Sequence, residues 1–228
     1  MTTAMVIENA PTWHLGRLET WLIDAGLEPE VLRPHTGDAI PERVDHHDAL
    51  IALGGGRGAA WTPELTALLR TTVADRLPLL AFCSSARSLA TSFGATTTPV
   101  ESFNPGPRLI GRRDAAADDP LFGTAPMAID VIRWRHETLT DLPPDARLLA
   151  ATPDGEPEIF RIGDRAWGIQ SHVEFDGAMV LGLDGDGELA RRVDAVTEHL
   201  AETWRPIIDR FAALAQGRTA SSPLPLLD

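Results

Sequence analysis

Cys83 is the only cysteine of the 228-residue chain, and it occupies a position where a thiol can act as a nucleophile. The apolar run 79–82 precedes it, and a helical pattern begins at Ser84. We interpret this as a strand–turn–helix elbow, which exposes the side chain above a sheet. The positive end of the helix dipole favours the thiolate, the reactive form. A buried structural cysteine is the alternative, and Cys83 alone leaves both open.

A thiol nucleophile needs a base and a group that orients the base. His172 and Glu174 are two residues apart, so in an extended segment they project to the same side. Glu174 can then hold one ring nitrogen of His172 while the other faces Cys83. We therefore expect these three residues to form a catalytic triad. The run His46–Asp48 has no partner cluster with ligand spacing, so we expect neither a metal nor a cofactor.

The elements that must position these residues alternate between strand and helix. Apolar strands are predicted at residues 5–7, 27–32, 49–53 and 77–82, and helices at 15–25, 62–75 and 84–93. Such alternation favours an α/β fold, with a parallel sheet covered on both faces. Ligands bind beyond the carboxyl ends of the strands in such sheets. The glycines at 54–56 and Cys83 each follow a strand there, so we expect the site at that edge.

The pattern changes after Thr96. Short strands are predicted at residues 109–111, 129–134, 148–151, 158–162 and 166–170. We expect them to form antiparallel hairpins that extend the same sheet. A long helix over about residues 187–214 should close the domain. The sequence thus predicts one domain over 1–215 and a disordered tail over 216–228, which is rich in turn formers.

Composition narrows the classes of function. The net charge of −13 repels phosphate backbones and anionic lipid surfaces, so we expect no nucleic-acid or membrane partner. A single cysteine cannot form an internal disulfide, which suits a reducing compartment. The amino terminus lacks the basic and apolar regions of a signal peptide, and no run reaches the roughly 18 apolar residues of a membrane span. These features predict a cytoplasmic protein.

Four segments, in order, resemble motifs of the class I (triad-type) glutamine amidotransferase family. They are the strand and glycine loop at 48–58, the elbow at 80–87, the segments 134–138 and 141–144, and residues 168–174, similar to G-x-Q-x-H-P-E. The resemblance covers most of the chain. It implies a flavodoxin-like, doubly wound, mostly parallel sheet with an antiparallel extension.

The resemblance also implies a mechanism. The Cys83 thiolate would attack the side-chain amide of glutamine, with the oxyanion held by backbone N–H groups near Gly55 or Gly56 and of Ser84. His172 would protonate the departing ammonia, and water would then hydrolyse the thioester to glutamate. A donor to an oxyanion is typically worth about 2.7–4 kcal/mol.

The chain departs from the family around substrate recognition. Ala81 and Ser85 replace glycines of the elbow, and Val173 replaces a proline. Arg87 stands where the family has a glutamine that shapes the substrate pocket, and Arg135 and His136 replace its His-Gly. A guanidinium accepts no hydrogen bond and favours carboxylate or phosphate partners. We therefore expect an altered substrate. The predicted substrate-binding residues are Arg87, Arg135, His136 and Gln170.

Three readings follow from these residues. The first is an enzyme, a cysteine-dependent amide hydrolase or amidotransferase acting on glutamine or a γ-glutamyl-like amide. The second keeps the triad but acts on a different carboxylate-bearing acyl or amide substrate in specialised biosynthesis. The third is a non-catalytic regulatory subunit. An amidotransferase of this kind would need a separate synthetase or acceptor-binding protein as its partner.

Overall fold

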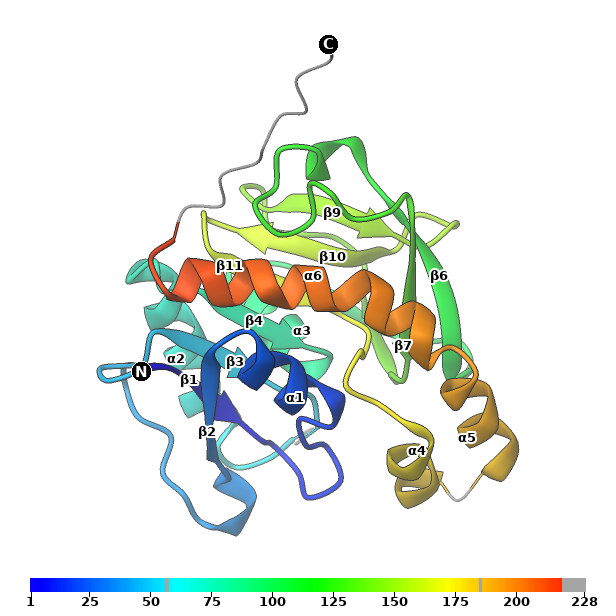
Figure 1. Ribbon diagram of the computed structural model, residues 1–228, viewed down its shortest axis with the longest axis horizontal. Helices are drawn as coiled ribbons and strands as arrows, with labels where there is room; N and C mark the ends of the chain where they lie inside the picture. The colour runs from blue at the N-terminus through cyan, green and yellow to red at the C-terminus, as the bar shows by residue number, and fades with distance from the viewer. Residues whose placement is uncertain (56–57, 185, 219–228) are drawn as a thin grey trace.

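A nine-stranded mixed sheet forms the centre of the molecule, with helices on both of its faces (Figure 1). The computed structural model describes residues 1–55, 58–184 and 186–218. The strands follow the order β2-β1-β3-β4-β11-β10-β9-β6-β7. This arrangement confirms the predicted flavodoxin-like α/β fold with an antiparallel extension.

Five neighbouring strands run parallel to one another. They are β2 (Leu27–Leu32), β1 (Thr2–Ile7), β3 (Ala49–Ala52), β4 (Leu79–Phe82) and β11 (Ala166–Ile169). The last three are buried along their whole length, as apolar runs predict for strands covered on two faces. Ile7 pairs with Ala52, Ala52 with Ala81, and Phe82 with Ile169. Four strands therefore end at one edge of the sheet.

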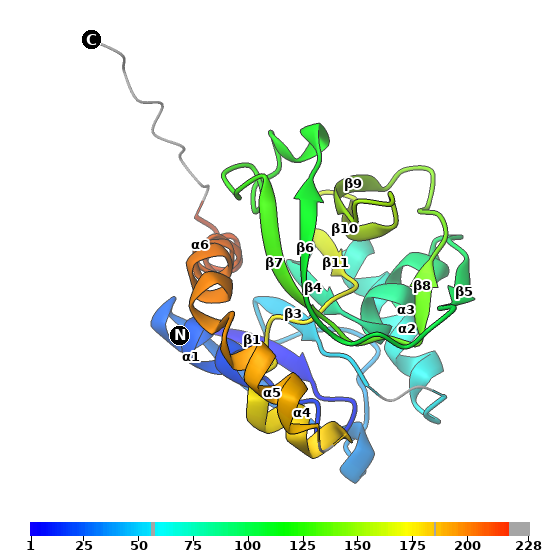
Figure 2. The ribbon, with the colours of Figure 1, turned by 90° about the vertical axis from the view of Figure 1, so that its right-hand side faces the viewer.

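The other half of the sheet is antiparallel. It consists of β10 (Pro157–Ile162), β9 (Arg147–Ala151), β6 (Gly106–Arg112) and β7 (Ala128–Arg133). These pairings confirm the predicted hairpin extension. Two further strands, β5 (Thr97–Pro99) and β8 (Glu137–Leu139), pair in a separate small sheet near α3 (Figure 2). Sequence analysis misses both because three residues are too few to show a period.

Two layers of helices cover the sheet. On one face α1 (Arg17–Asp24) and the long α6 (Thr197–Ala215) lie across it, and α2 (Thr62–Ala74) and α3 (Ser84–Ser92) lie on the other (Figure 1). Each layer has its own apolar core, because the side chains of a strand alternate between the two faces. Trp204 of α6 also donates a hydrogen bond from its indole to the carbonyl of Asp130 at 2.8 Å.

The prediction of one helix over residues 187–214 is wrong. The segment forms α5 (Gly187–Asp194) and α6, which are separated at Val196 with φ −103° and ψ 5°. Val196 and Thr197 are β-branched and therefore weak helix formers. The two helices also pack on different elements, α5 on β6 and α6 on α1 and β7. A further helix, α4 (Gly177–Asp184), packs beside α5 and is not predicted from the sequence.

The chain after α6 remains in contact with the domain over the residues that the structure describes. The Gln216 amide donates to the carbonyls of Ala25 and Gly26 at 3.1 and 3.0 Å. Most of the predicted tail, residues 219–228, lies outside the described residues. Within the described ranges, none of the helices combines the length and apolar character that a membrane crossing requires.

Candidate active site

Four loops meet where β1, β3, β4 and β11 end, and they carry the residues singled out from the sequence. The first carries Asn9 and Trp13, the second Gly54 and Gly55, the third Cys83, and the fourth His172 and Glu174. The carboxyl edge of a parallel sheet is where such folds bind ligands. The predicted nucleophile, base and orienting group are therefore brought to one place.

Cys83 forms a sharp turn between β4 and α3. Its φ of 52° and ψ of −114° lie in a region that non-glycine residues rarely adopt, as a nucleophile elbow requires. Its N–H donates to the carbonyl of Ile169 at 2.8 Å, which ties the turn to β11. A Cβ atom on Gly54 would lie 2.9 Å from Cys83 Cβ and 2.9 Å from Trp13 Cε3. The close packing at the elbow thus requires glycine at position 54.

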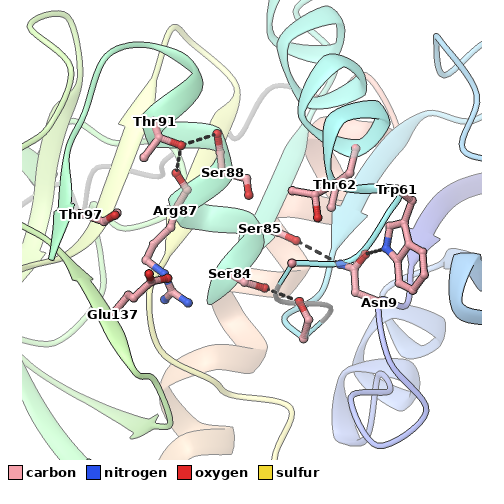
Figure 3. Close-up of a pocket in the computed structure, with 13 residues that line it drawn as sticks. Asn9, Trp61, Thr62, Ser84, Ser85, Arg87, Ser88, Thr91, Thr97 and Glu137 are labelled. Atoms are coloured by element: carbon pink, nitrogen blue, oxygen red, sulfur yellow. Dashed lines mark hydrogen bonds between the residues drawn. The ribbon is translucent and has the colours of Figure 1, made fainter. Parts of the chain in front are cut away.

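Ser85 stands where the resembling family has glycine, and this structure uses its hydroxyl. Ser85 Oγ donates to the carbonyl of Leu53 at 2.6 Å, and the Asn9 amide donates to that Oγ at 3.2 Å. The Asn9 carbonyl oxygen accepts from the Trp61 indole at 3.1 Å (Figure 3). The extra atoms of Ser85 therefore link the elbow to the loop that follows β1.

His172 and Glu174 form a buried pair. Nδ1 of His172 lies 2.6 Å from Oε1 of Glu174, and the Val173 N–H donates to Oε2 at 2.9 Å. The main chain of His172 exchanges two hydrogen bonds with Ile132 at the end of β7. The histidine is thus fixed through both its backbone and its ring.

The carbonyl oxygen of Trp134 contacts both Cys83 and His172. Nε2 of His172 lies 3.3 Å from this oxygen, and the Cys83 thiol donates to it at 3.5 Å. The ring nitrogen that faces away from Glu174 therefore lies on the Cys83 side. The side chains thus lie in the order Cys83, His172 and Glu174, which is the order of thiol, imidazole and carboxylate in a triad.

Two aromatic residues that sequence analysis misses hold the His172 ring. Phe175 stacks on the imidazole with centroids 4.1 Å apart, and Trp13 meets it edge-on at 5.0 Å. Both rings also contact each other at 5.4 Å. The only signal in the sequence is that each follows a strand end, and such residues are usually core.

The charges of the site favour an ion pair. Burial has the largest effect on Cys83 and raises the pKa of its thiol, but His172 and Arg87 together outweigh it, and the pKa falls to about 7. Burial lowers the pKa of His172, whereas Cys83 and Glu174 raise it through charge and hydrogen bonding, to about 10. Between pH 7 and pH 10 the Cys83 thiolate and the His172 imidazolium therefore coexist.

Arg87 lies at the junction of two adjoining cavities. One, of ≈ 100 Å³, contains Cys83 and Trp134, and the other, of ≈ 190 Å³, contains Asn9 and several hydroxyl groups. Gly55, Ser84, Arg87 and Glu137 line both. Figure 3 shows the side chains of Arg87 and Glu137 together on one side of the larger cavity.

The predicted oxyanion donors lie beside the smaller cavity. Gly55 has φ +84°, and its carbonyl accepts from Ser84 Oγ at 2.7 Å. The Ser84 N–H is in the first turn of α3, where N–H groups have no partner within the helix. Gly56 lies outside the described residues.

The other predicted substrate contacts differ in position. His136 lines the smaller cavity and stacks on Phe103 with centroids 4.3 Å apart. Arg135 also lines it, but its buried guanidinium lies 2.6 Å from Glu158 and 3.1 Å from Glu156. These two carboxylates already neutralise the charge of Arg135.

Gln170 lines neither of the two cavities. Its amide accepts from the N–H of Leu139 at 3.1 Å and donates to the carbonyl of Pro157. This geometry gives no support to a substrate contact, because the amide is buried and joins two backbone segments. Among the described residues, no group of three or more His, Cys, Asp or Glu side chains is arranged to hold a metal.

Several known proteins are similar to this chain in sequence. The chain is 30% identical to aminodeoxychorismate synthase of Streptomyces griseus over 178 residues, which are 76% of this chain and 23% of that protein. It is 24% identical to the glutamine amidotransferase-like protein YfeJ of Salmonella typhimurium, over 72% of each. It is 28% identical to a glutamine-hydrolysing GMP synthase of Porphyromonas gingivalis, over 67% of this chain and 32% of that protein. Two of these three relatives are thus much longer than the aligned segment.

Solved structures support the same conclusion about the fold. A glutamine amidotransferase from Methylobacillus flagellatus matches with a TM-score of 0.80 at 20% identity, over 92% of this chain and 94% of the other. One from Thermotoga maritima matches with a TM-score of 0.79 at 17% identity, over 92% and 98%. No family model matches the sequence. Fold and relatives together define the class of protein. The relatives and the solved structures together support a class I glutamine amidotransferase-like family for this chain.

Proposed function

We propose that the chain is a cysteine-dependent amide hydrolase or amidotransferase that cleaves the side-chain amide of glutamine or of a γ-glutamyl-like substrate. The observation that carries the proposal is the arrangement of Cys83, His172 and Glu174, with a 2.6 Å contact between His172 Nδ1 and Glu174 and both reacting groups near the Trp134 carbonyl. The relatives named above support amide chemistry on glutamine.

In the proposed first half-reaction, the Cys83 thiolate attacks the amide carbonyl carbon, and the electron pair moves to the oxygen. The N–H groups of Ser84 and of the glycine loop near Gly55 stabilise this oxyanion. When the C–N bond breaks, the proton on His172 Nε2 passes to the amide nitrogen, which leaves as ammonia. A thioester on Cys83 remains.

In the second half-reaction, water attacks the thioester while the now neutral His172 takes one of its protons. The C–S bond breaks, the carboxylic acid leaves, and the thiolate–imidazolium pair is restored. Glu174 keeps the ring oriented and stabilises its positive charge in both steps.

We further propose that Arg87 selects the substrate. Its buried guanidinium lines both cavities beside the nucleophile, and a guanidinium binds carboxylates through charge-assisted hydrogen bonds. This position favours the second reading, in which the same triad acts on another carboxylate-bearing amide or acyl compound. Any ammonia acceptor would belong to a separate synthetase partner.

The proposal is tested by incubating the protein with a panel of amides that includes glutamine and γ-glutamyl compounds. Ammonia release is measured, and intact mass spectrometry detects an acyl adduct. We expect turnover of at least one amide, and Cys83→Ala should abolish both turnover and adduct while the protein remains folded. Substantial turnover by Cys83→Ala would refute the thioester mechanism. A folded protein that forms no adduct with any amide would favour a non-catalytic subunit.

A further inference from the structure

The Arg87 guanidinium lies directly against the sulfur of Cys83. Its Nη1 and Nη2 atoms are 3.9 and 4.0 Å from Sγ. Arg87 lies in α3, four residues after Cys83, which caps the amino end of that helix, and the Arg87 N–H donates to the Cys83 carbonyl at 3.1 Å. A side chain four residues after the elbow therefore returns to the same face of the helix and reaches the thiol.

A buried arginine needs a counter-charge. Arg87 is 8% exposed, and its Nε has no hydrogen-bond partner among the described residues. Arg135, which is buried a short distance away, is neutralised by Glu158 and Glu156. An uncompensated buried cation is costly. An anion at Sγ, which both terminal nitrogens of Arg87 approach, reduces that cost.

From these contacts we infer that Arg87 is a second counter-ion of the Cys83 thiolate. Cys83 would then be held between two cations, the imidazolium of His172 and the guanidinium of Arg87. The inference rests on the proposed role of Cys83 as nucleophile, but it concerns the reactivity of the sulfur before any substrate binds. It differs from substrate selection, because it predicts an effect of Arg87 on reagents that carry no carboxylate.

Several charged groups around Cys83 affect how readily its thiol becomes a thiolate. His172 and Arg87 favour the thiolate by charge, and Glu174, behind His172, opposes it. Glu137, His136 and Arg135 line the same cavity. Replacing Arg87 removes one of the two favourable charges and leaves the other titratable groups in place.

The test is the rate at which iodoacetamide, a neutral reagent, alkylates Cys83 between pH 5 and pH 10. Because the chain has one cysteine, intact mass reports this residue alone. We expect Arg87→Gln to react about tenfold more slowly than wild type near pH 6, since the charge-assisted contact is lost. At alkaline pH, where both thiols are ionised, the variant should react faster than wild type, because nucleophilicity rises with thiol pKa. The two rate profiles should therefore cross.

Arg205→Gln is the matched control. It removes the same charge from an exposed arginine of α6, which pairs with Asp24, and its profile should follow wild type. Arg87→Lys keeps a positive charge but replaces the guanidinium with a single ammonium group. Its alkylation rate near pH 6 should therefore lie between those of wild type and Arg87→Gln. If circular dichroism shows that Arg87→Gln does not fold, two other measurements decide the question. They are the rate profile of Arg87→Lys and the pH at which the wild-type alkylation rate is half its maximum.

Several outcomes would overturn the inference. They are superimposable profiles for wild type and Arg87→Gln, a uniform loss of rate at every pH, or a wild-type midpoint near the ordinary cysteine value of about 8.5. Failure of the proposed function looks different. If the protein hydrolyses no amide but its rate profiles cross, the result supports the Arg87–thiolate pair and refutes only the proposed amide substrate.

Discussion

The main-chain N–H of Val173 donates to Oε2 of Glu174 at 2.9 Å. The other oxygen of that carboxylate lies 2.6 Å from Nδ1 of His172, so both oxygens of Glu174 are engaged. A proline at position 173, as in the family motif, has no N–H to donate. The substitution that separates this chain from the motif therefore adds a contact that holds the orienting carboxylate.

Val173→Pro should lower kcat about threefold to tenfold, because one hydrogen bond to Glu174 worth about 0.5–1.5 kcal/mol is removed. Val173→Ala is the control: it keeps the N–H, so kcat should change less than twofold. The buried valine does contribute to the core, so Val173→Ala should lose about 1–3 kcal/mol of stability. Steady-state kinetics and thermal unfolding of both variants separate the two effects. Equal kcat values for Val173→Pro and wild type would show that the contact is dispensable.

The pH dependence of kcat/KM should be bell-shaped. The acid limb should fall near pH 7, where Cys83 becomes a thiolate, and the alkaline limb near pH 10, where His172 loses the proton it must donate. Glu174 raises the pKa of His172, so Glu174→Gln should move the alkaline limb to lower pH. The same variant should lower kcat by about 10–10⁴, with His172→Ala at least as damaging. An alkaline limb that does not move in Glu174→Gln would contradict the orienting role.

Gly54→Ala should damage both the fold and the activity. The added methyl group would lie 2.9 Å from Cys83 Cβ and 2.9 Å from Trp13, too close without displacing the elbow. We expect a loss of about 1–3 kcal/mol in stability and at least a tenfold loss in kcat. Gly182→Ala in α4 is the matched control, because its methyl group would meet nothing within 4 Å. It should be neutral or stabilising by up to about 1 kcal/mol. Similar behaviour of the two variants in unfolding and kinetics would show that position 54 is not crowded.

Arg87→Gln should change substrate preference. Glutamine hydrolysis, relative to hydrolysis of the native substrate, should rise by about one or two powers of ten if Arg87 binds a substrate carboxylate. The comparison uses the ratio of two kcat/KM values, because any change in the thiolate affects both substrates and cancels. A wild type that matches an ordinary glutaminase, with an unchanged ratio in Arg87→Gln, would show that Arg87 is not the selector.

Local sequence patterns were enough to predict the scaffold and the position of Cys83 at the turn between a strand and a helix. Residues 49–53 and 77–82 are apolar over the length of a buried strand, and the glycines or Cys83 follow at once. The spacing of His172 and Glu174 likewise predicts their contact, because residues two apart in extended chain share a side. These inferences depend only on neighbours in the chain.

The tertiary structure alone decides which distant groups meet at Cys83. Trp13, the Trp134 carbonyl and the His172 ring come from three separate loops, and no local period connects them. The break between α5 and α6 also depends on what each helix packs against. Sequence shows that Arg87 follows Cys83 by four residues. Whether its guanidinium turns toward the sulfur or toward a carboxylate depends on which charges the folded chain buries beside it, and here both terminal nitrogens lie within 4.0 Å of Sγ.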